Sequence, residues 1–257
     1  MAALAFVFLM ATAVEARAAA AEPPSISVLV PVVGSVAGIG VVWKTDVELR
    51  NDTSQEATVA LSLPAAVDEP TILLTLPAGG VQRFTDVVGE AFGMAQALSP
   101  LRVQTLGRHS VRVTATVYGV RGADITKPEP IPVIYSDPYY PLRRLDGLSF
   151  SDDFRTNIGL ANLGEKEASF TLALQRVVGR NVAVARVTIP RNALWHQAIQ
   201  AIFPLITKGD DFTVIVETGS HDTYVYGSVI DNRTSDARFI PPALGAPSAQ
   251  DADRQTQ

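Results

Sequence analysis

A nine-residue pattern occurs twice in this chain, at positions 111 residues apart. The first copy, WKTDVELRN, covers residues 43–51, and the second, FRTNIGLAN, covers residues 154–162. Hydrophobic and polar residues alternate in both copies, which is typical of a β-strand that buries one of its two faces. This repeat limits the architecture more than any other feature, because both copies are expected to fold as the same structural unit.

The alternation assigns the side chains of each copy to an inner and an outer face. The residues expected in the hydrophobic core are Trp43, Val47, Leu49, Phe154, Ile158 and Leu160. The outer face is expected to carry Lys44, Asp46, Glu48 and Arg50 in the first copy, and Arg155, Asn157, Gly159 and Ala161 in the second. Asp46 is the most prominent polar group, but its counterpart Asn157 cannot ionise. A structural role for Asp46, in a hydrogen bond to a loop or turn, is therefore expected.

The correspondence between the copies continues beyond these strands. The paired segments are ATVALSL (57–63) with ASFTLAL (168–174), TLPAGG (75–80) with TIPRNA (188–193), and LRVQT (101–105) with FTVIV (212–216). Before the last pair lie FTDVVGEAFG (84–93) and ALWHQAIQAIFP (193–204), in which hydrophobic residues recur at a spacing of three and four. This spacing predicts a short helix in each copy, with Thr85 or Asp86 as the first N-cap and His196 on the second helix.

The repeat unit is long enough to be a whole domain. It spans about 110 residues, whereas solenoid repeats have roughly 20–50. Its short alternating segments, separated by Gly, Asn, Asp and Pro, are typical of a β-sandwich. The sequence therefore predicts an all-β protein of two tandem β-sandwich domains, each with one short helix between strands. The expected boundaries are a signal peptide at 1–21, domains at 22–133 and 134–242, and a disordered tail at 243–257.

The repeated motifs resemble a known group of proteins. The order W-x-T-D-V-x-L-x-N, a V-x-L strand, L-P-A-G and F-x-D-V-V-x-x-x-F-G is similar to the tandem repeat of uncharacterised exported bacterial proteins. More loosely, the units resemble immunoglobulin-like and fibronectin-type β-sandwich modules. The resemblance covers most of the chain after the expected signal peptide and implies an immunoglobulin-like fold. Because the motif is a packing motif, it implies no catalytic residues.

The N-terminal residues have the pattern of a cleaved secretory signal. An apolar run from Ala2 to Val14 is followed by small residues in A-x-A arrangements. Glu15 and Arg17 interrupt the run before it reaches the roughly 20 apolar residues of a membrane-spanning helix. We therefore expect no membrane span after signal cleavage and export to the periplasm, the cell surface or the extracellular medium. The chain has no cysteine, so core burial is expected to stabilise it without disulfide bonds.

Charge and ligand spacing argue against nucleic-acid and transition-metal binding. The net charge is −5, and the basic residues are scattered, which leaves no basic face for nucleic acid. The chain has three histidines, His109, His196 and His221. None lies at the spacing of a zinc site, so no metal or cofactor is expected. The acidic pairs Asp152–Asp153 and Asp210–Asp211 leave calcium binding open as an alternative.

No motif of a known catalytic site is present in the sequence. Ser220, His221 and Asp222 are adjacent on an expected extended turn, where their side chains point in different directions and cannot form a catalytic relay. The glycine-rich segment GSVAGIG (34–40) precedes a strand and lacks the pattern of a phosphate-binding loop. The protein is therefore predicted not to be an enzyme.

Tyrosines are the main candidates for contact with a partner. Tyr135, Tyr139 and Tyr140 lie in a proline-rich junction, and Tyr224 and Tyr226 share one face of an expected strand. Tyrosine buries a large area at small entropic cost, which suits contact with a protein or glycan at the cell surface and equally suits packing between two domains. The leading expectation is a non-catalytic exported protein that acts in binding, adhesion or surface assembly. The alternative is a carbohydrate-binding accessory protein.

Overall fold

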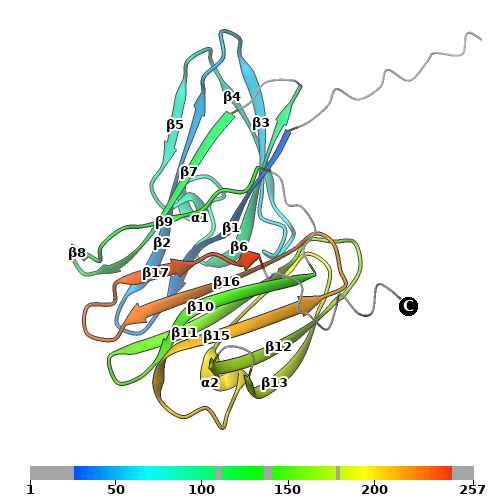
Figure 1. Ribbon diagram of the computed structural model, residues 1–257. Coiled ribbons are helices and arrows are strands. Elements are labelled where there is room, and N and C mark those ends of the chain that lie inside the picture. Colours follow the sequence, from blue (N-terminus) through cyan, green and yellow to red (C-terminus); the bar gives the residue numbers. More distant parts are fainter. Residues whose placement is uncertain (1–25, 108–110, 136–140, 178–179, 245–257) are drawn as a thin grey trace, which may run out of the picture.

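The computed structural model is all-β in the ranges that it describes, residues 26–107, 111–135, 141–177 and 180–244 (Figure 1). Within these ranges the strands form sheets of nine, five and four strands. We call residues 26–135 the first half and residues 141–244 the second half. No helix in the described part of the chain combines the length and the apolar character needed to cross a membrane.

The two halves contain a similar succession of elements. The first half has β1 (Ile26–Ala37), β2 (Val42–Asn51), β3 (Ala57–Ser62), β4 (Thr71–Leu76), β5 (Val81–Phe84), α1 (Val87–Glu90), β6 (Ala97–Leu106), β7 (Val111–Arg121), β8 (Asp124–Ile125) and β9 (Glu129–Ile131). The second half has β10 (Leu142–Phe150), β11 (Phe154–Asn162), β12 (Ala168–Val177), β13 (Arg180–Ile189), β14 (Ala193–Ala198), α2 (Ile199–Ile202), β15 (Gly209–Thr218), β16 (Thr223–Asp231), β17 (Ala237–Ile240) and β18 (Ala243–Leu244).

The order of strand pairing in the first half recurs in the second. In the first half, one run of neighbouring strands is β4, β3, β6 and β1, and the other is β5, β2, β7 and β9. In the second half, the five-stranded sheet has the order β13, β12, β15, β10 and β18, and the four-stranded sheet has the order β14, β11, β16 and β17. The nine-residue motif lies in β2 and in β11, so the repeat in sequence coincides with a repeat in strand pairing.

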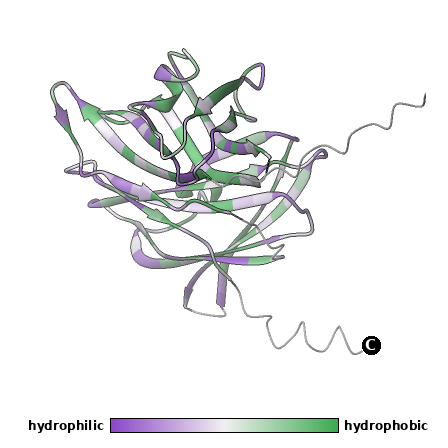
Figure 2. Cartoon of the chain, turned by 90° about the horizontal axis from the view of Figure 1, so that it is seen from above, coloured by the Kyte–Doolittle hydropathy of each residue, from purple (hydrophilic) through white to green (hydrophobic). Residues whose placement is uncertain are grey.

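Each half buries a hydrophobic core between its two runs of strands. In the first half, Leu49 of β2 belongs to the same buried cluster as Leu61 of β3. In the second half, Leu160 of β11 belongs to the same cluster as Leu172 of β12. Figure 2 shows the alternation behind this burial as bands of hydrophobic and hydrophilic residues along the strands. The arrangement is consistent with a β-sandwich, in which the inward side chains of two layers form the core.

A repeated threonine connects the first two long strands of each half. Thr45 Oγ1 accepts a hydrogen bond from the Gly34 backbone N–H at 3.0 Å. Its counterpart Thr156 accepts one from the Ser149 N–H at 3.1 Å and donates to the Ser149 carbonyl at 2.6 Å. In the first half, β1 also pairs with β2 near their shared hairpin, whereas β10 and β11 lie in separate sheets. The threonine contact is therefore common to both halves although the sheet connection differs.

The last residue of the motif, an asparagine, makes the same set of hydrogen bonds in both halves. Asn51 Nδ2 lies 2.7–3.1 Å from the carbonyl oxygens of Gln55, Leu76 and Pro77, and its Oδ1 accepts from the Thr53 N–H. Asn162 Nδ2 lies 2.7–3.0 Å from three carbonyls, and its Oδ1 accepts from a backbone N–H. The carbonyls around Asn162 belong to Lys166, Ile189 and Pro190. Each asparagine thus joins the loop after its strand to the end of another hairpin.

The helices are shorter than the sequence spacing predicts. Both have four residues, and in the second half the segment Ala193–Ala198 forms strand β14 before α2 begins. The expected position of His196 on the helix is therefore wrong, because His196 pairs with Gly159 in the sheet. In the first half, Asp86 is the N-cap of α1 and its side chain accepts from the Gly89 N–H at 3.3 Å, as expected.

The expected domain boundaries need two adjustments. Ile134 exchanges backbone hydrogen bonds with Leu29, so the ordered contacts of the first half continue past residue 133. Ala243 and Leu244 form β18 and pair with β10, so the expected tail begins two residues too early. The expected signal peptide at 1–21 and residues 245–257 of the expected tail lie outside the described residues.

Candidate functional site

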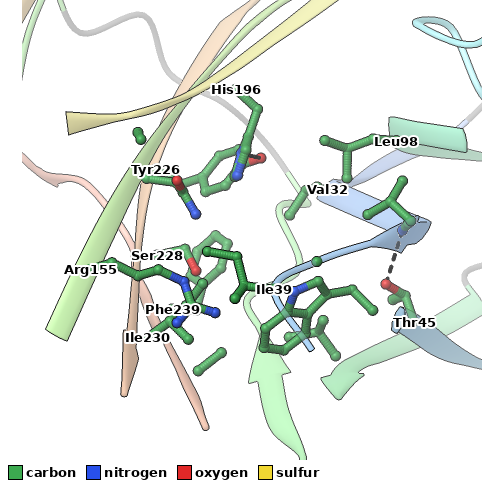
Figure 3. Close-up of a pocket in the computed structure, with 18 of the residues that line it drawn as sticks. Val32, Ile39, Thr45, Leu98, Arg155, His196, Tyr226, Ser228, Ile230 and Phe239 are labelled. Atoms are coloured by element: carbon green, nitrogen blue, oxygen red, sulfur yellow. Dashed lines mark hydrogen bonds between the residues drawn. The ribbon is translucent and has the colours of Figure 1, made fainter. Parts of the chain in front are cut away.

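A cavity of about 430 Å³ lies between the two halves (Figure 3). The first half lines it mainly with β1 and the β1–β2 hairpin, and the second half with β11, β14, β16 and β17. In Figure 3, Val32 and Leu98 lie on one side, Arg155 and Tyr226 lie on the other, and Ile39 reaches between them. The volume is in the range of small-molecule sites, roughly 300–1,000 Å³. We call the contact surface between the halves the seam and this cavity the seam pocket.

The seam is apolar because the second half adds aromatic side chains to the core of the first. Ala161, Tyr224, Tyr226 and Phe239 belong to the same buried hydrophobic cluster as the first-half core. Strands β11 and β16 are therefore buried on both faces, with the second-half core on one side and the first half on the other. Hydrogen bonds support the seam at both ends, from Phe239 N–H to Glu129 Oε1 at 2.9 Å and from Asn192 Nδ2 to Glu69 Oε2 at 3.0 Å.

The tyrosines predicted to bind a partner lie in different environments. Tyr224 and Tyr226 are only 6% and 1% exposed, so they offer almost no surface to an external partner, because the first half covers their face of β16. Packing between the halves, the other interpretation of these two tyrosines, agrees with their contacts. Tyr135 is 52% exposed, and its hydroxyl accepts from the Val113 N–H at 3.3 Å. Tyr139 and Tyr140 lie outside the described residues.

The predicted core residues are not all equally buried. Four of them are almost completely buried: Val47, Leu49, Ile158 and Leu160. Trp43 and Phe154 are half-buried because they lie near the first residues of their strands. Trp43 lines the seam pocket. Its indole ring lies against Gly38, where an added Cβ would overlap with the ring.

Gly159 determines where the ring of Tyr226 lies. The strand register places Gly159 directly between Tyr226 on β16 and His196 on β14. A Cβ at Gly159 would overlap with Cε1 and Cζ of Tyr226, so the ring lies across the glycine. The Tyr226 hydroxyl thereby reaches His196 Nδ1 at 2.9 Å. The Tyr226 ring also stacks on Phe239, with the ring centroids 5.2 Å apart. Strands β14, β16 and β17 thus present one packed aromatic surface to the seam pocket.

His196 is neutral in the folded protein at neutral pH. Burial lowers its pKa to about 4, because desolvation disfavours the charged imidazolium. Burial also raises the pKa of Tyr226, which keeps the phenol protonated. The hydrogen bond between the two rings therefore joins two uncharged groups, and His196 contributes polarity but no charge to the seam pocket.

This burial of His196 predicts a pH-dependent stability. Unfolded histidine titrates near pH 6.5, so between about pH 6.5 and pH 4 the unfolded state binds a proton that the folded state does not. The free energy of unfolding should therefore decrease as the pH falls through this window, by on the order of 3 kcal/mol. His196→Gln should abolish that contribution in urea unfolding measured at several pH values. An unchanged dependence of the unfolding free energy on pH in His196→Gln would contradict the interpretation.

Arg155 supplies the only formal charge among the side chains that line the seam pocket in the described residues. Burial lowers its pKa, and the negative charge of Asp231 acts in the opposite direction. Arg155 Nη1 donates to Asn232 Oδ1 at 2.8 Å. No further hydrogen bond from the guanidinium is found within the described residues, so its other donors remain free to bind a ligand. Arg155 corresponds to Lys44 in the first copy of the motif.

Asp46, the counterpart of Asn157 in the first half, has a structural role. Asp46 Oδ1 accepts hydrogen bonds from the Asp86 N–H at 3.0 Å and from the Tyr118 hydroxyl at 2.8 Å. Asp86 is also paired with Lys44 Nζ at 3.0 Å. The expected role of Asp46 in bonding to a turn is therefore confirmed, since these contacts hold the start of α1 against β2.

The described residues contain no cluster of three or more His, Cys, Asp or Glu side chains that could hold a metal ion. Among the histidines named above, His196 bonds to Tyr226 and His221 lies in the exposed turn between β15 and β16, while His109 lies outside the described residues. The chemistry of the seam pocket therefore rests on aromatic and aliphatic surface, neutral hydrogen-bonding groups and one guanidinium. Comparison with known proteins found no match to a family model, a curated protein or a solved structure.

Proposed function

We propose that this protein is an exported, non-catalytic binding protein of two tandem immunoglobulin-like β-sandwich domains, with a ligand site in the seam pocket. The observation that carries the proposal is the apolar cavity of about 430 Å³ between the halves. Apolar walls with a few convergent polar groups are the usual form of a small-molecule site. Of the expected roles in binding, adhesion and surface assembly, binding is the one that a cavity of this kind favours.

The tandem-domain part of the proposal rests on repetition. The strand order of the first half recurs in the second, and the threonine and asparagine of the motif make equivalent contacts in both halves. The export part rests on the N-terminal apolar run followed by small residues. A ligand between two domains is in keeping with the general preference of ligand sites for domain interfaces.

The polar groups in the seam pocket favour binding over catalysis. His196 bonds to Tyr226 and not to a carboxylate, whereas the Ser-His-Asp relay uses a carboxylate to orient the histidine. No Asp or Glu occurs among the described lining residues. Ser228 lies in the pocket but pairs across the strands with Asn157, which cannot act as a general base.

The carbohydrate-binding alternative receives less support from the geometry. A carbohydrate-binding surface of this type would present a row of exposed aromatic side chains, and Tyr224 and Tyr226 share one face of β16. Both are buried in the seam. A protein or glycan partner at the cell surface therefore stays a proposal that involves other surfaces, such as the exposed Tyr135.

Filling the seam pocket tests the proposed binding site. The neutral dye N-phenyl-1-naphthylamine, which fluoresces in apolar surroundings, should bind the wild type in a saturable way. Ser228→Phe places a large ring inside the pocket and should reduce dye affinity by about tenfold or more. Ser169→Phe makes the same change on the exposed face of β12 and should bind the dye like the wild type. Equal binding by both variants, each with an intact cooperative melt, would refute the site.

A further inference from the structure

Resting on the proposed function, we propose that the seam pocket selects an apolar monoanion, a molecule with a hydrocarbon body and a single carboxylate that pairs with Arg155. The inference combines the apolar walls of the cavity with the single charged side chain on them. It assigns the ligand class and the orientation in which the ligand lies.

The hydrocarbon body is matched by the walls of the cavity. Val32 and Leu98 from the first half face Tyr226 and Phe239 from the second half (Figure 3). Removal of hydrocarbon from water stabilises a complex by about 25 cal/mol per Å² of buried apolar surface. Ile39, at the tip of the β1–β2 hairpin, is 74% exposed, so it offers further apolar surface beside the mouth of the pocket.

The carboxylate position follows from the strand register. Arg155 and Asn157 are two residues apart on β11, so they project from the same face about 6.6 Å apart along the strand. Ser228 of β16 lies directly opposite Asn157. A guanidinium, an amide and a hydroxyl therefore lie on one part of the pocket wall, and the aromatic surface at Gly159 and Tyr226 begins two residue pairs further along, on the same face. The ligand would place its carboxylate at the Arg155 end and its hydrocarbon body over Tyr226.

The charge balance disfavours other ligand classes relative to a monoanion. A cation would be repelled by Arg155, and no lining Asp or Glu in the described residues could compensate its charge. A neutral ligand would leave the partly desolvated guanidinium without a new partner. A dianion would bring a second negative charge into apolar surroundings, where an unpaired charge is costly. A carboxylate can accept two parallel hydrogen bonds from one guanidinium, which is the strongest pairing available here.

Three probes with the same alkyl chain separate this inference from the proposed function. Decanoate, decan-1-ol and decylamine differ only in head group and carry a negative, no and a positive charge at neutral pH. In isothermal titration calorimetry of the protein, decanoate should bind about tenfold or more tightly than decan-1-ol. Decylamine should bind most weakly.

Variants then assign the preference to Arg155. Arg155→Gln should lower the affinity for decanoate to that for decan-1-ol and leave decan-1-ol binding unchanged. Arg83→Gln removes an exposed arginine that pairs with Glu48 outside the pocket, and it should keep the preference for decanoate. Equal binding of decanoate and decan-1-ol to the wild type would overturn the inference and leave the proposed function standing. Decanoate preference that persists in Arg155→Gln would also overturn it, and binding of none of the probes would overturn both proposals.

Discussion

Asn162→Ala should lower the free energy of unfolding by about 3 kcal/mol. The substitution removes the amide that lies within 3.0 Å of the Ile189 and Pro190 carbonyls and 2.7 Å of the Lys166 carbonyl. Asn162 is 1% exposed, so water cannot readily replace the amide, and a buried carbonyl without a partner costs about 1–3 kcal/mol. Asn51→Ala should have an effect of similar size, because Asn51 makes the equivalent bonds in the first half.

Asn157→Ala provides the matched control for this prediction. Asn157 lies on the same strand as Asn162, but its side chain lines the seam pocket, and no hydrogen bond from it is found within the described residues. The change should alter stability by no more than about 0.5 kcal/mol. Urea unfolding of the three variants provides the comparison. If Asn162→Ala were as stable as Asn157→Ala, the repeated asparagine would not hold the loops as described.

Tyr226→Ala should destabilise the protein by about 3–5 kcal/mol. The ring is 1% exposed, stacks on Phe239 and belongs to the core cluster of the first half although it comes from the second. Its removal would leave a cavity next to the seam pocket and would take away the hydrogen-bond partner of His196. Calorimetric melting would measure the loss of stability and would also show whether the two halves still unfold together.

Two further tyrosine variants separate the causes of this effect. Tyr226→Phe keeps the ring and removes only the hydroxyl, so it should cost about 1 kcal/mol. Tyr135→Ala truncates a tyrosine that is 52% exposed and should cost much less than Tyr226→Ala. A similar loss in Tyr226→Ala and Tyr135→Ala would show that the seam contributes little to stability.

The strands could be predicted from the sequence because their alternation is a local property. The motifs at 43–51 and 154–162 form β2 and β11 as predicted, and the repeated order of elements followed from the alignment of the two copies. The first and last residues of the helices were harder to predict. In ALWHQA, residues Leu194, His196 and Ala198 alternate as in a strand, while Leu194, Ala198 and Ile199 also fit helical spacing. Backbone pairing with β11 favours the strand for this segment. Because β11 is distant in the sequence, the pattern of a few neighbouring residues does not reveal this pairing.

The seam could have been suspected from a difference between the two copies. The outer face of the first motif carries Lys44, Asp46, Glu48 and Arg50, whereas the second carries Arg155, Asn157, Gly159 and Ala161. Small uncharged residues on a face that is expected to meet water are typical of a surface that another element covers. The sequence TYVYG of β16 places two tyrosines on one face and Val225 and Gly227 on the other, so neither face is charged, which fits a strand buried on both sides.

The seam pocket itself could not be derived from the sequence. Its lining combines β1 and β2 with β11, β14, β16 and β17, and which surface covers β11 depends on how the two halves pack. Arg155 stood out in the sequence only as one member of an alternating pattern. The spacing of hydrophobic residues places His196 on a helix, so the sequence does not predict its bond to Tyr226 across Gly159.

A crystal structure of the protein with decanoate would test the central claim most directly, because it shows the halves and the ligand together. The account predicts that the alkyl chain lies in the seam pocket between Val32 and Tyr226, with its carboxylate at Arg155 and with Tyr226 still bonded to His196. Two halves that lie apart, with Tyr226 exposed to solvent, would contradict the account, and so would decanoate bound only outside the seam.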